Sequence, residues 1–207
     1  MRPALTRHLT DIVPFAHALL QHVLQPGDVA IDATAGNGYD TLLLAQWVGD
    51  GGRIYAFDVQ AQAIEATRER LQAHGLADRV SVIHAGHETV LQHVTQPVQA
   101  AVFNLGYLPR SDKQITTQAD STIAALQGIW QLLRPHGVIV LVVYHGHAGG
   151  KQERSAVEDY VCGLDPAAVR VVRYALANVP NDPPYVLALE KLEPFRSDSS
   201  GRTSDMQ

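Results

Sequence analysis

The sequence predicts one α/β domain in which a mostly parallel sheet of seven strands carries helices on both faces. Short apolar runs alternate with longer amphipathic stretches of helical spacing along most of the 207 residues. Repeated strand-then-helix units favour parallel strands that are joined by helical crossovers. The run at 138–144 is almost wholly apolar, which is typical of a strand that is covered on both faces.

The expected elements follow one another in a regular order. Strands are predicted at 29–33, 53–58, 80–84, 100–105, 138–144, 169–177 and 185–192, and helices at 13–24, 39–48, 61–73, 88–94, 120–133 and 152–162. Pro135 and Gly137 are expected to end the helix at 120–133. No helical stretch separates the last two strands, so the C-terminal strand is predicted to pair antiparallel. Residues 1–195 are expected to form the domain, and the polar tail 196–207 is expected to be disordered.

Composition excludes several classes of protein. With 46% hydrophobic and 18% charged residues, disorder over most of the length is not expected. No apolar run reaches the roughly 18 residues of a membrane helix, and the first residues lack the pattern of a signal peptide, so a cytoplasmic protein without a membrane partner is predicted. Cys162 is the single cysteine, which excludes an internal disulfide and a cysteine-based metal cluster.

The turn after the first strand predicts a cofactor site. Gly36 and Gly38 permit positive φ and a close approach of backbone to ligand, and a helix begins directly after them. Thr41 stands where a dinucleotide-binding turn has its third glycine, which favours a ligand without phosphates, such as S-adenosylmethionine. The residues of this turn expected at the cofactor are Asp32, Thr34, Gly36, Asn37, Gly38, Asp40 and Thr41, although Asp40 and Thr41 are equally good helix-start residues.

The ends of the next two strands add candidates for the same cofactor. Asp58 lies about 20 residues beyond the glycine turn, where a carboxylate accepts hydrogen bonds from both ribose hydroxyls. Gln60 is expected to add an amide contact. His87 and Glu88 follow the third strand, where they either bond the edge of the adenine or belong to a solvated loop.

Asn104 and Tyr107, after the fourth strand, predict the reaction site. Many amine-methylating enzymes place (Asn/Asp/Ser)-Pro-Pro-(Tyr/Phe) here, and this chain keeps the polar and aromatic positions around Leu105-Gly106. An Asn oxygen that accepts the target N–H keeps the nitrogen lone pair aimed at the methyl group, and an aromatic ring stacks on a flat substrate. The alternative is that Asn104 only forms a turn.

The lone cysteine and two histidines narrow the chemistry. Cys162 is far in sequence from the strand ends, so a covalent cysteine route to a pyrimidine carbon is disfavoured and a nitrogen or oxygen acceptor is preferred. An alkylamine acceptor must first lose a proton. His145 is a candidate base and His147 lies beside it, and each is as easily a structural hydrogen-bonding group. The His-x-His pair lacks a third ligand at motif spacing, so no metal is predicted.

Together these residues resemble a known family. Residues 32–38 with Asp40-Thr41, 57–60, 103–109 and 144–147 with Gly149-Gly150 look like the YtqB/MnmM-type methyltransferases, a family first described as rRNA methylases. The resemblance runs from about residue 13 to 193. It implies a Rossmann-like class I methyltransferase fold with S-adenosylmethionine as cofactor. It also implies methylation of the amine of 5-aminomethyl-2-thiouridine at the tRNA wobble position, with Asn104 and Tyr107 at that amine.

The resemblance also makes a tRNA anticodon arm the expected partner, despite a net charge of -5. A small group of cationic side chains around the site suffices to bind one anticodon arm. The expected members of this cationic rim are Arg7, Arg110, Lys113, Lys151 and Arg154. His147 is also expected to contact the substrate. Arg110 departs from the family, which more often has small glycines there. Scattered solvated charge is the alternative for this rim. A ribosomal RNA base or a small-molecule amine as substrate, a non-catalytic binding protein, and a homodimer are all left open by the sequence.

Overall fold

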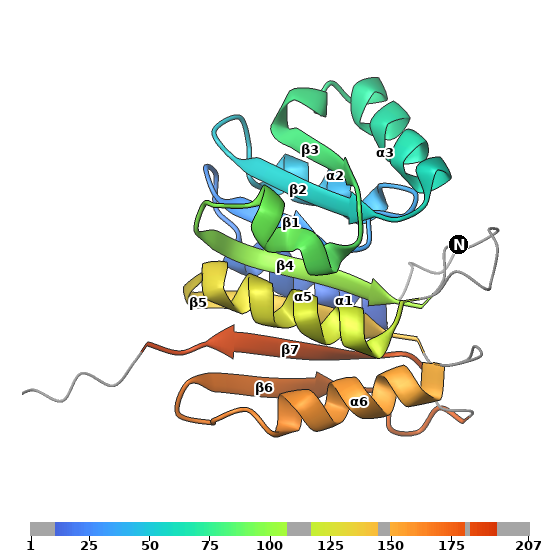
Figure 1. The fold of residues 1–207 in the computed structure, drawn as a ribbon, viewed down its shortest axis with the longest axis vertical. Helices are drawn as coiled ribbons and strands as arrows, with labels where there is room; N and C mark the ends of the chain where they lie inside the picture. The colour runs from blue at the N-terminus through green and yellow to red at the C-terminus, as the bar shows by residue number, and fades with distance from the viewer. Residues whose placement is uncertain (1–10, 107–116, 145–149, 181–182, 194–207) are drawn as a thin grey trace, which may run out of the picture.

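A seven-stranded sheet between two layers of helices forms the core of the protein (Figure 1). The structure is a computed structural model that describes residues 11–106, 117–144, 150–180 and 183–193. The strands are β1 (Val29–Asp32), β2 (Arg53–Asp58), β3 (Val80–His84), β4 (Val98–Leu105), β5 (Leu133–Val143), β6 (Val169–Tyr174) and β7 (Tyr185–Lys191). Their spatial order is β3-β2-β1-β4-β5-β7-β6, and β7 is antiparallel to both of its neighbours. The predicted fold class is confirmed.

Helices cover both faces of the sheet, as expected. They are α1 (Ile12–Val23), α2 (Tyr39–Trp47), α3 (Ala61–Ala73), α4 (Val90–His93), α5 (Ala119–Leu132) and α6 (Gly150–Cys162). One core joins α1, α2 and α3 to the sheet, and a second core joins α4, α5 and α6 to the opposite face. In Figure 1, α5 and α6 lie in front of the sheet and α1 lies behind it.

Strand β4 shows why the central strands read as continuous apolar runs. Ala101 and Phe103 pack in the core under α5, whereas Ala100 and Val102 pack in the core under α1 and α2. All four are fully buried. Because successive side chains of a strand point to opposite faces, a strand covered on both sides accepts polar side chains only near its two ends, which in β4 are Gln99 and Asn104.

The start of β5 and the short helix after β3 correct the sequence prediction. β5 begins at Leu133, five positions before the predicted start, because the chain passes from α5 directly into an irregular first segment of the strand. Leu133 pairs with Val98, a register shift follows, and His136 has a positive φ of 61°. The expected helix at 88–94 is a 3-10 turn, His87–Thr89, that continues into the one-turn α4. The other predicted boundaries agree with the structure within three residues.

Parallel pairing brings the polar ends of several strands to one edge of the sheet. Asp32 pairs in register with Val102, and Leu105 pairs with Val143, so β1, β4 and β5 end at neighbouring places. Asp58 ends β2 beside β1. In Figure 1 these ends lie on the right, where the arrowheads of β2 and β4 point.

Gly38 is required by packing between the glycine turn and α3. It precedes α2 with a φ of 76°, and a Cβ built there would lie 2.9 Å from Cα of Thr67. This glycine therefore permits a close approach to helix α3, and the predicted approach to a ligand stays a prediction. Gly75 has a similar φ of 68°, but nothing lies within 4 Å of a Cβ built on it.

This pair of glycines gives a matched test of the packing. Gly38→Ala and Gly75→Ala both force an alanine into the left-handed region, at about 1–2 kcal/mol each. Only Gly38→Ala also pushes α3 away from the turn, so we expect it to lower the free energy of unfolding by roughly a further 1–3 kcal/mol. Urea denaturation of both variants measures the difference, and equal losses would show that the contact with Thr67 relaxes freely.

Candidate active site

The carboxylate of Asp32 closes the turn between β1 and α2. The side chain is fully buried, and it accepts hydrogen bonds from the backbone N–H of Thr34 (3.1 Å) and from Oγ1 of Thr41 (2.5 Å). Thr41 is itself fully buried in α2. Neither side chain is open to a ligand, so any contribution of this pair to cofactor binding is made through the shape and charge of the turn.

Burial makes ionisation of Asp32 costly. Loss of solvent, together with the negative charges of Asp40 and Asp58, raises the pKa of this carboxyl to about 7, while the hydrogen bonds from Thr41 and Thr34 act in the opposite direction. Three carboxylates thus lie close enough around the end of β1 to affect one another. The edge of the sheet is electrostatically negative here, which suits a ligand that carries a positive charge.

Asp58 links the end of β2 to the glycine turn. Oδ2 accepts from the backbone N–H of Gly36 (2.9 Å), and Oδ1 accepts from that of Gln60 (2.9 Å). Each carboxylate oxygen has two lone pairs, so both keep one for a further donor. A pair of ribose hydroxyls fits this arrangement. Gln60 precedes α3 and its side chain forms no capping bond to that helix.

Helix α3 holds the carbonyl groups of the glycine turn from the other side. Thr67 donates from Oγ1 to the carbonyl of Gly36 (3.1 Å), and Arg70 donates from Nε to the carbonyl of Asn37 (2.7 Å). The guanidinium of Arg70 also lies 3.7 Å from the centre of the Tyr39 ring, which is 61% exposed. The turn is therefore fixed before any ligand binds.

Three features beside Asp58 fit an adenosine group. Val59 follows Asp58 and is 57% exposed, so it offers an apolar surface beside the carboxylate that a ligand could cover. Glu88 folds over Gly86 so closely that a Cβ there would lie 2.2 Å from its carboxylate oxygens. His87 is 8% exposed and donates from Nδ1 to the carbonyl of Ala33 (2.9 Å), and its Nε2 has no partner among the described residues. That nitrogen is an unfilled acceptor.

Asn104 lies at the end of β4, where the structure connects it to the glycine turn. Its backbone N–H donates to Oγ1 of Thr34 (2.7 Å), and its side-chain Nδ2 donates to Oδ2 of Asp40 (2.5 Å). Thr34 and Asp40 were both predicted at the cofactor, and the structure shows that each contacts Asn104. The sequence-predicted cofactor turn and acceptor residue are thus parts of one hydrogen-bonded unit.

His17 of α1 is the second partner of Asp40. Its Nε2 donates to Oδ1 of Asp40 (2.7 Å), and its ring lies edge-to-face against Trp47 of α2, with centroids 6.2 Å apart. Tyr144, just beyond β5, is also near Asp40: burial raises the pKa of its hydroxyl, and the charge of Asp40 raises it further.

A buried glutamate fixes the base of the segment that follows β4. Gly106 and Thr117 exchange two hydrogen bonds, Thr117 N–H to the Gly106 carbonyl and Gly106 N–H to Oγ1 of Thr117 (both 3.0 Å). Glu153 of α6, 4% exposed, accepts from Oγ1 of Thr117 (2.7 Å) and from Oγ1 of Thr122 (3.0 Å). Gly106 and Thr117, the described residues on either side of positions 107–116, are therefore held to each other and to α6.

Much of the predicted acceptor side lies outside the described residues. This is true of Arg7, Tyr107, Arg110, Lys113, His145 and His147 and of the side chain of Lys151. Arg154 is described, and it pairs with Glu158 (3.5 Å) and lies over the ring of Tyr185. Within the described ranges, no three His, Cys, Asp or Glu side chains are grouped to hold a metal ion, and no helix there is long and apolar enough to cross a membrane.

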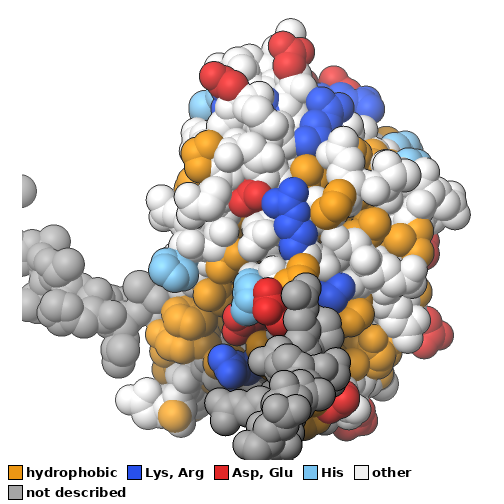
Figure 2. Space-filling view, turned by 90° about the vertical axis from the view of Figure 1, so that its left-hand side faces the viewer, with side chains coloured by type: hydrophobic (Ala, Val, Ile, Leu, Met, Phe, Trp, Pro, Cys, Tyr) orange, Lys and Arg blue, Asp and Glu red, His pale blue; other side chains and the backbone are white. Residues whose placement is uncertain are grey.

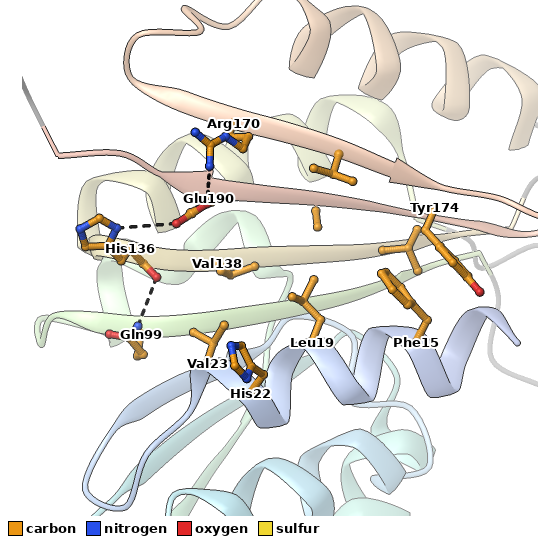
Figure 3. A pocket seen from close by; sticks show the side chains of 13 residues that line it. Phe15, Leu19, His22, Val23, Gln99, His136, Val138, Arg170, Tyr174 and Glu190 are labelled. Carbon is orange, nitrogen blue, oxygen red and sulfur yellow. Dashed lines mark hydrogen bonds and ion pairs between the residues drawn. The ribbon is translucent and has the colours of Figure 1, made fainter. Parts of the chain in front are cut away.

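Two other surfaces of the molecule lie away from the carboxyl edge of the sheet, where the predicted site residues are. Figure 2 views the left-hand side of Figure 1, opposite the candidate site, where Lys and Arg side chains are scattered among acidic and neutral ones. A hollow of about 540 Å³ lies between α1 and the β5-β7-β6 face. Phe15 and Leu19 point into it, and His136 and Arg170 lie at one end (Figure 3). It contains none of the predicted site residues, so the candidate site is defined by the strand ends.

Several side chains at the site were not predicted from the sequence. They include His17, Val59, Thr67, Arg70, Thr117 and Glu153. His17 and Glu153 reach the site from distant helices, and a helical stretch carries no motif that marks such a residue. Val59 gave no signal either, because single exposed apolar side chains are normal on a protein surface.

Residues 54–190 match the family model described as "Putative rRNA methylase". A curated relative, the chloroplastic tRNA (mnm(5)s(2)U34)-methyltransferase of Arabidopsis thaliana, is 38% identical over 186 residues, which are 85% of this chain and 68% of the relative.

Solved structures agree with the sequence relatives. A Clostridium thermocellum protein of the same description as the family is 36% identical with a TM-score of 0.88, over 90% of this chain and 100% of that one. A Streptococcus mutans protein solved in complex with SAH is 38% identical with a TM-score of 0.82, over 89% and 99% of the two chains. The chain therefore belongs to the "Putative rRNA methylase" family of S-adenosylmethionine-dependent methyltransferases.

Proposed function

We propose that this enzyme transfers the methyl group of S-adenosylmethionine to the amine of 5-aminomethyl-2-thiouridine at the wobble position of tRNA. The observation that carries the proposal is the orientation of Asn104, whose Nδ2 donates to Asp40 at the carboxyl edge of the sheet. The amide oxygen Oδ1 is the end that remains to accept an N–H. The Arabidopsis relative, whose name specifies this uridine, matches over 186 residues and supports the choice of substrate.

The cofactor is proposed to lie across the ends of β1 and β2. Asp58 would accept the ribose hydroxyls, Val59 would cover one face of the adenine, and His87 and Glu88 would lie at its edge. When bound, the cofactor supplies an electrophilic methyl group on a positively charged sulfonium. Gly36 and Gly38 shape the turn beside it, and the braces from α3 keep that turn rigid.

The acceptor side is proposed to start from Asn104 and Tyr144. Asn104 would hold the amine by its N–H, so that the nitrogen lone pair faces the methyl group. Tyr107, Arg110, Lys113, His147 and Lys151 are proposed to contact the base and its phosphates, with His145 as a base for the amine proton. The anticodon arm of tRNA is the proposed partner. A homodimer and a cytoplasmic location stay predictions.

Nucleoside analysis tests the proposed substrate. Bulk tRNA from a strain that lacks this gene is digested and examined by mass spectrometry, before and after treatment with the purified enzyme and cofactor. We expect 5-aminomethyl-2-thiouridine to accumulate in the strain and to be converted to the methylaminomethyl form in vitro. Unchanged tRNA with a methyl group added instead to ribosomal RNA or to a small amine would replace the proposal by one of those substrates. Cofactor binding without any methyl transfer would support a non-catalytic binding protein.

The role of Asp58 predicts a specific loss of cofactor affinity. Asp58→Asn keeps the size of the side chain and one acceptor oxygen but removes the negative charge. Hydrogen bonds to a charged group contribute about 1.5–3 kcal/mol, so we expect affinity for S-adenosylmethionine to fall by roughly 10- to 100-fold. Isothermal titration calorimetry measures it, with Asp120→Asn in the exposed first turn of α5 as the control. Wild-type affinity in Asp58→Asn would remove the ribose role.

The role of Asn104 predicts a defect in turnover. Asn104→Ala removes the acceptor oxygen and leaves the turn, Asp58 and α3 in place. We expect kcat to fall by roughly 10- to 1000-fold, because the amine is no longer oriented, while the Kd for the cofactor stays within a few-fold. Single-turnover assays with 5-aminomethyl-2-thiouridine tRNA measure the rate. A normal rate would exclude Asn104 from the mechanism.

The burial of Asp32 predicts an unusual pH dependence of stability. Its carboxyl has an ordinary pKa of 3.8 and a pKa of about 7 in the folded protein. Below pH 3.8 both states are protonated, and between these values only the unfolded state ionises, so this group lowers stability as pH rises to about 7. Asp32→Asn removes the effect. We therefore expect Asp32→Asn to gain stability relative to the wild type as the pH rises from about 4 to 7. The difference between their free energies of unfolding should grow by at most about 1.4 kcal/mol per pH unit and be constant above about pH 7. Urea denaturation across this range measures it, and a constant difference would contradict the raised pKa.

A further inference from the structure

A hydrogen-bonded chain of three side chains crosses the candidate site from α1 to β4. His17 Nε2 and Asp40 Oδ1 are 2.7 Å apart, and Asp40 Oδ2 and Asn104 Nδ2 are 2.5 Å apart. The side chains of His17 and Asp40 are 26% and 16% exposed, so the chain is largely shielded from water. The three residues are separated by 23 and 64 positions in sequence, and only the fold brings them together.

The chemistry of a carboxylate fixes the direction of both bonds. Ionised Asp40 only accepts hydrogen bonds, so His17 must carry its proton on Nε2, and Asn104 must turn its NH₂ group toward Asp40. An asparagine amide has one donor end and one acceptor end. Because Asp40 holds the donor end, Oδ1 of Asn104 is directed away from Asp40. An amide without this partner has two orientations that differ little in energy.

A simpler explanation is that Asp40 stabilises the start of α2 as an acidic residue in the first turn. That effect contributes about 0.3–1 kcal/mol and needs no particular partner. It does not explain why both oxygens of Asp40 are engaged by side chains of other elements. The charge of Asp40 also has a cost, because it raises the pKa of the buried Asp32 and that of Tyr144 and so makes ionisation of Asp32 less favourable. Stabilisation of the start of α2 does not explain why a charge is kept at a place where it has this cost.

We propose that Asp40, held by His17, is a positioning residue for methyl transfer, which orients the amide of Asn104 so that Oδ1 accepts the N–H of the substrate amine. The proposal rests on the proposed function and moves Asp40 from the cofactor to the acceptor side of the site. It gives His17, which no sequence motif marks, a role in turnover. Asp40 and His17 act through Asn104 and touch neither the cofactor nor the amine.

Exchange of the two polar groups tests the Asp40–Asn104 contact directly. Asn104→Asp alone places two carboxylates face to face, which shifts one of them to its protonated form or pushes them apart. In the double variant Asn104→Asp/Asp40→Asn, the new amide at position 40 would accept from His17 through its oxygen and donate through its NH₂ group to the new carboxylate at position 104. Every donor again meets an acceptor, and position 104 still offers an oxygen to the amine.

We expect Asn104→Asp to lower kcat by roughly 100-fold and the double variant to recover at least about tenfold of that loss. Asp40→Ala should lower kcat roughly 10- to 100-fold, and the Kd for S-adenosylmethionine should stay within about threefold. His17→Leu should lower kcat severalfold, and His17→Gln, which keeps a donor, should recover most of it. Asp120→Ala in the first turn of α5 and His22→Gln on α1 are the matched controls. Circular dichroism confirms that each variant is folded.

A double variant no more active than Asn104→Asp would overturn the proposal. So would wild-type turnover in Asp40→Ala, or a loss of cofactor affinity in that variant as large as its loss of kcat. NMR provides a readout without substrate: the side-chain NH₂ signal of Asn104, assigned by its loss in Asn104→Asp, should shift and exchange faster with water in Asp40→Ala. If the wild type methylates no aminomethyl-thiouridine, the proposed function fails, and this NMR signal still decides whether Asp40 holds Asn104. An unchanged signal rejects the contact.

Discussion

The buried carboxylate of Asp32 is the interaction on which the site depends. It joins the end of β1 to the backbone of Thr34 and to Thr41 of α2, so the glycine turn has one shape and α2 starts in one place. The consequences extend to the acceptor side. Thr34 receives the backbone N–H of Asn104, and α2 carries Asp40 to the side chain of Asn104. A shift of the turn by a fraction of an ångström would therefore move the group proposed to bind the amine together with the surface proposed to bind the cofactor.

Three carboxylates, those of Asp32, Asp40 and Asp58, lie at the same edge of the sheet, and the described residues do not neutralise their negative charge. Asp40 and Asp58 raise the cost of ionising the buried Asp32, and within the described residues the only cationic partner of the three is His17 when it is protonated. A sulfonium group, and an ammonium group before it loses its proton, would both be attracted to this edge. Methyl transfer leaves the spent cofactor as a neutral thioether and moves the positive charge to the amine nitrogen until a proton leaves, so the spent cofactor would be attracted less than S-adenosylmethionine. Attraction of the positively charged cofactor is a physical reason for a methyltransferase to keep three neighbouring carboxylates, although their mutual repulsion lowers the stability of the fold.

The sequence predicted the sheet well because local pattern and tertiary structure agree there. β2, β3 and α3 have the bounds expected from their apolar runs and flanking turns. β5 was placed too late, because Pro135 and Gly137 normally end regular structure and only the pairing of Leu133 with Val98 shows that the strand has begun. At the candidate site, Asp58 and Asn104 could be named as candidates from the sequence because each lies at the end of a predicted strand. His17 and Glu153 were not found, because their contacts are with residues 23 or more positions away and depend on how the helices pack.

The acceptor side is anchored by contacts that are independent of the cofactor turn. β4 ends at Leu105 and β5 ends at Val143, shortly before Tyr107 and His145 in sequence. The Tyr144 N–H donates to the carbonyl of Leu105, so these two strand ends are neighbours. Glu153 of α6 accepts from Thr117, which is bonded to Gly106. Because Glu153 is 4% exposed and bonds two hydroxyl groups, its replacement by an apolar residue would leave both hydroxyls without this acceptor. These contacts of Glu153 are separate from those that hold Asn104, which are made by Thr34 and Asp40.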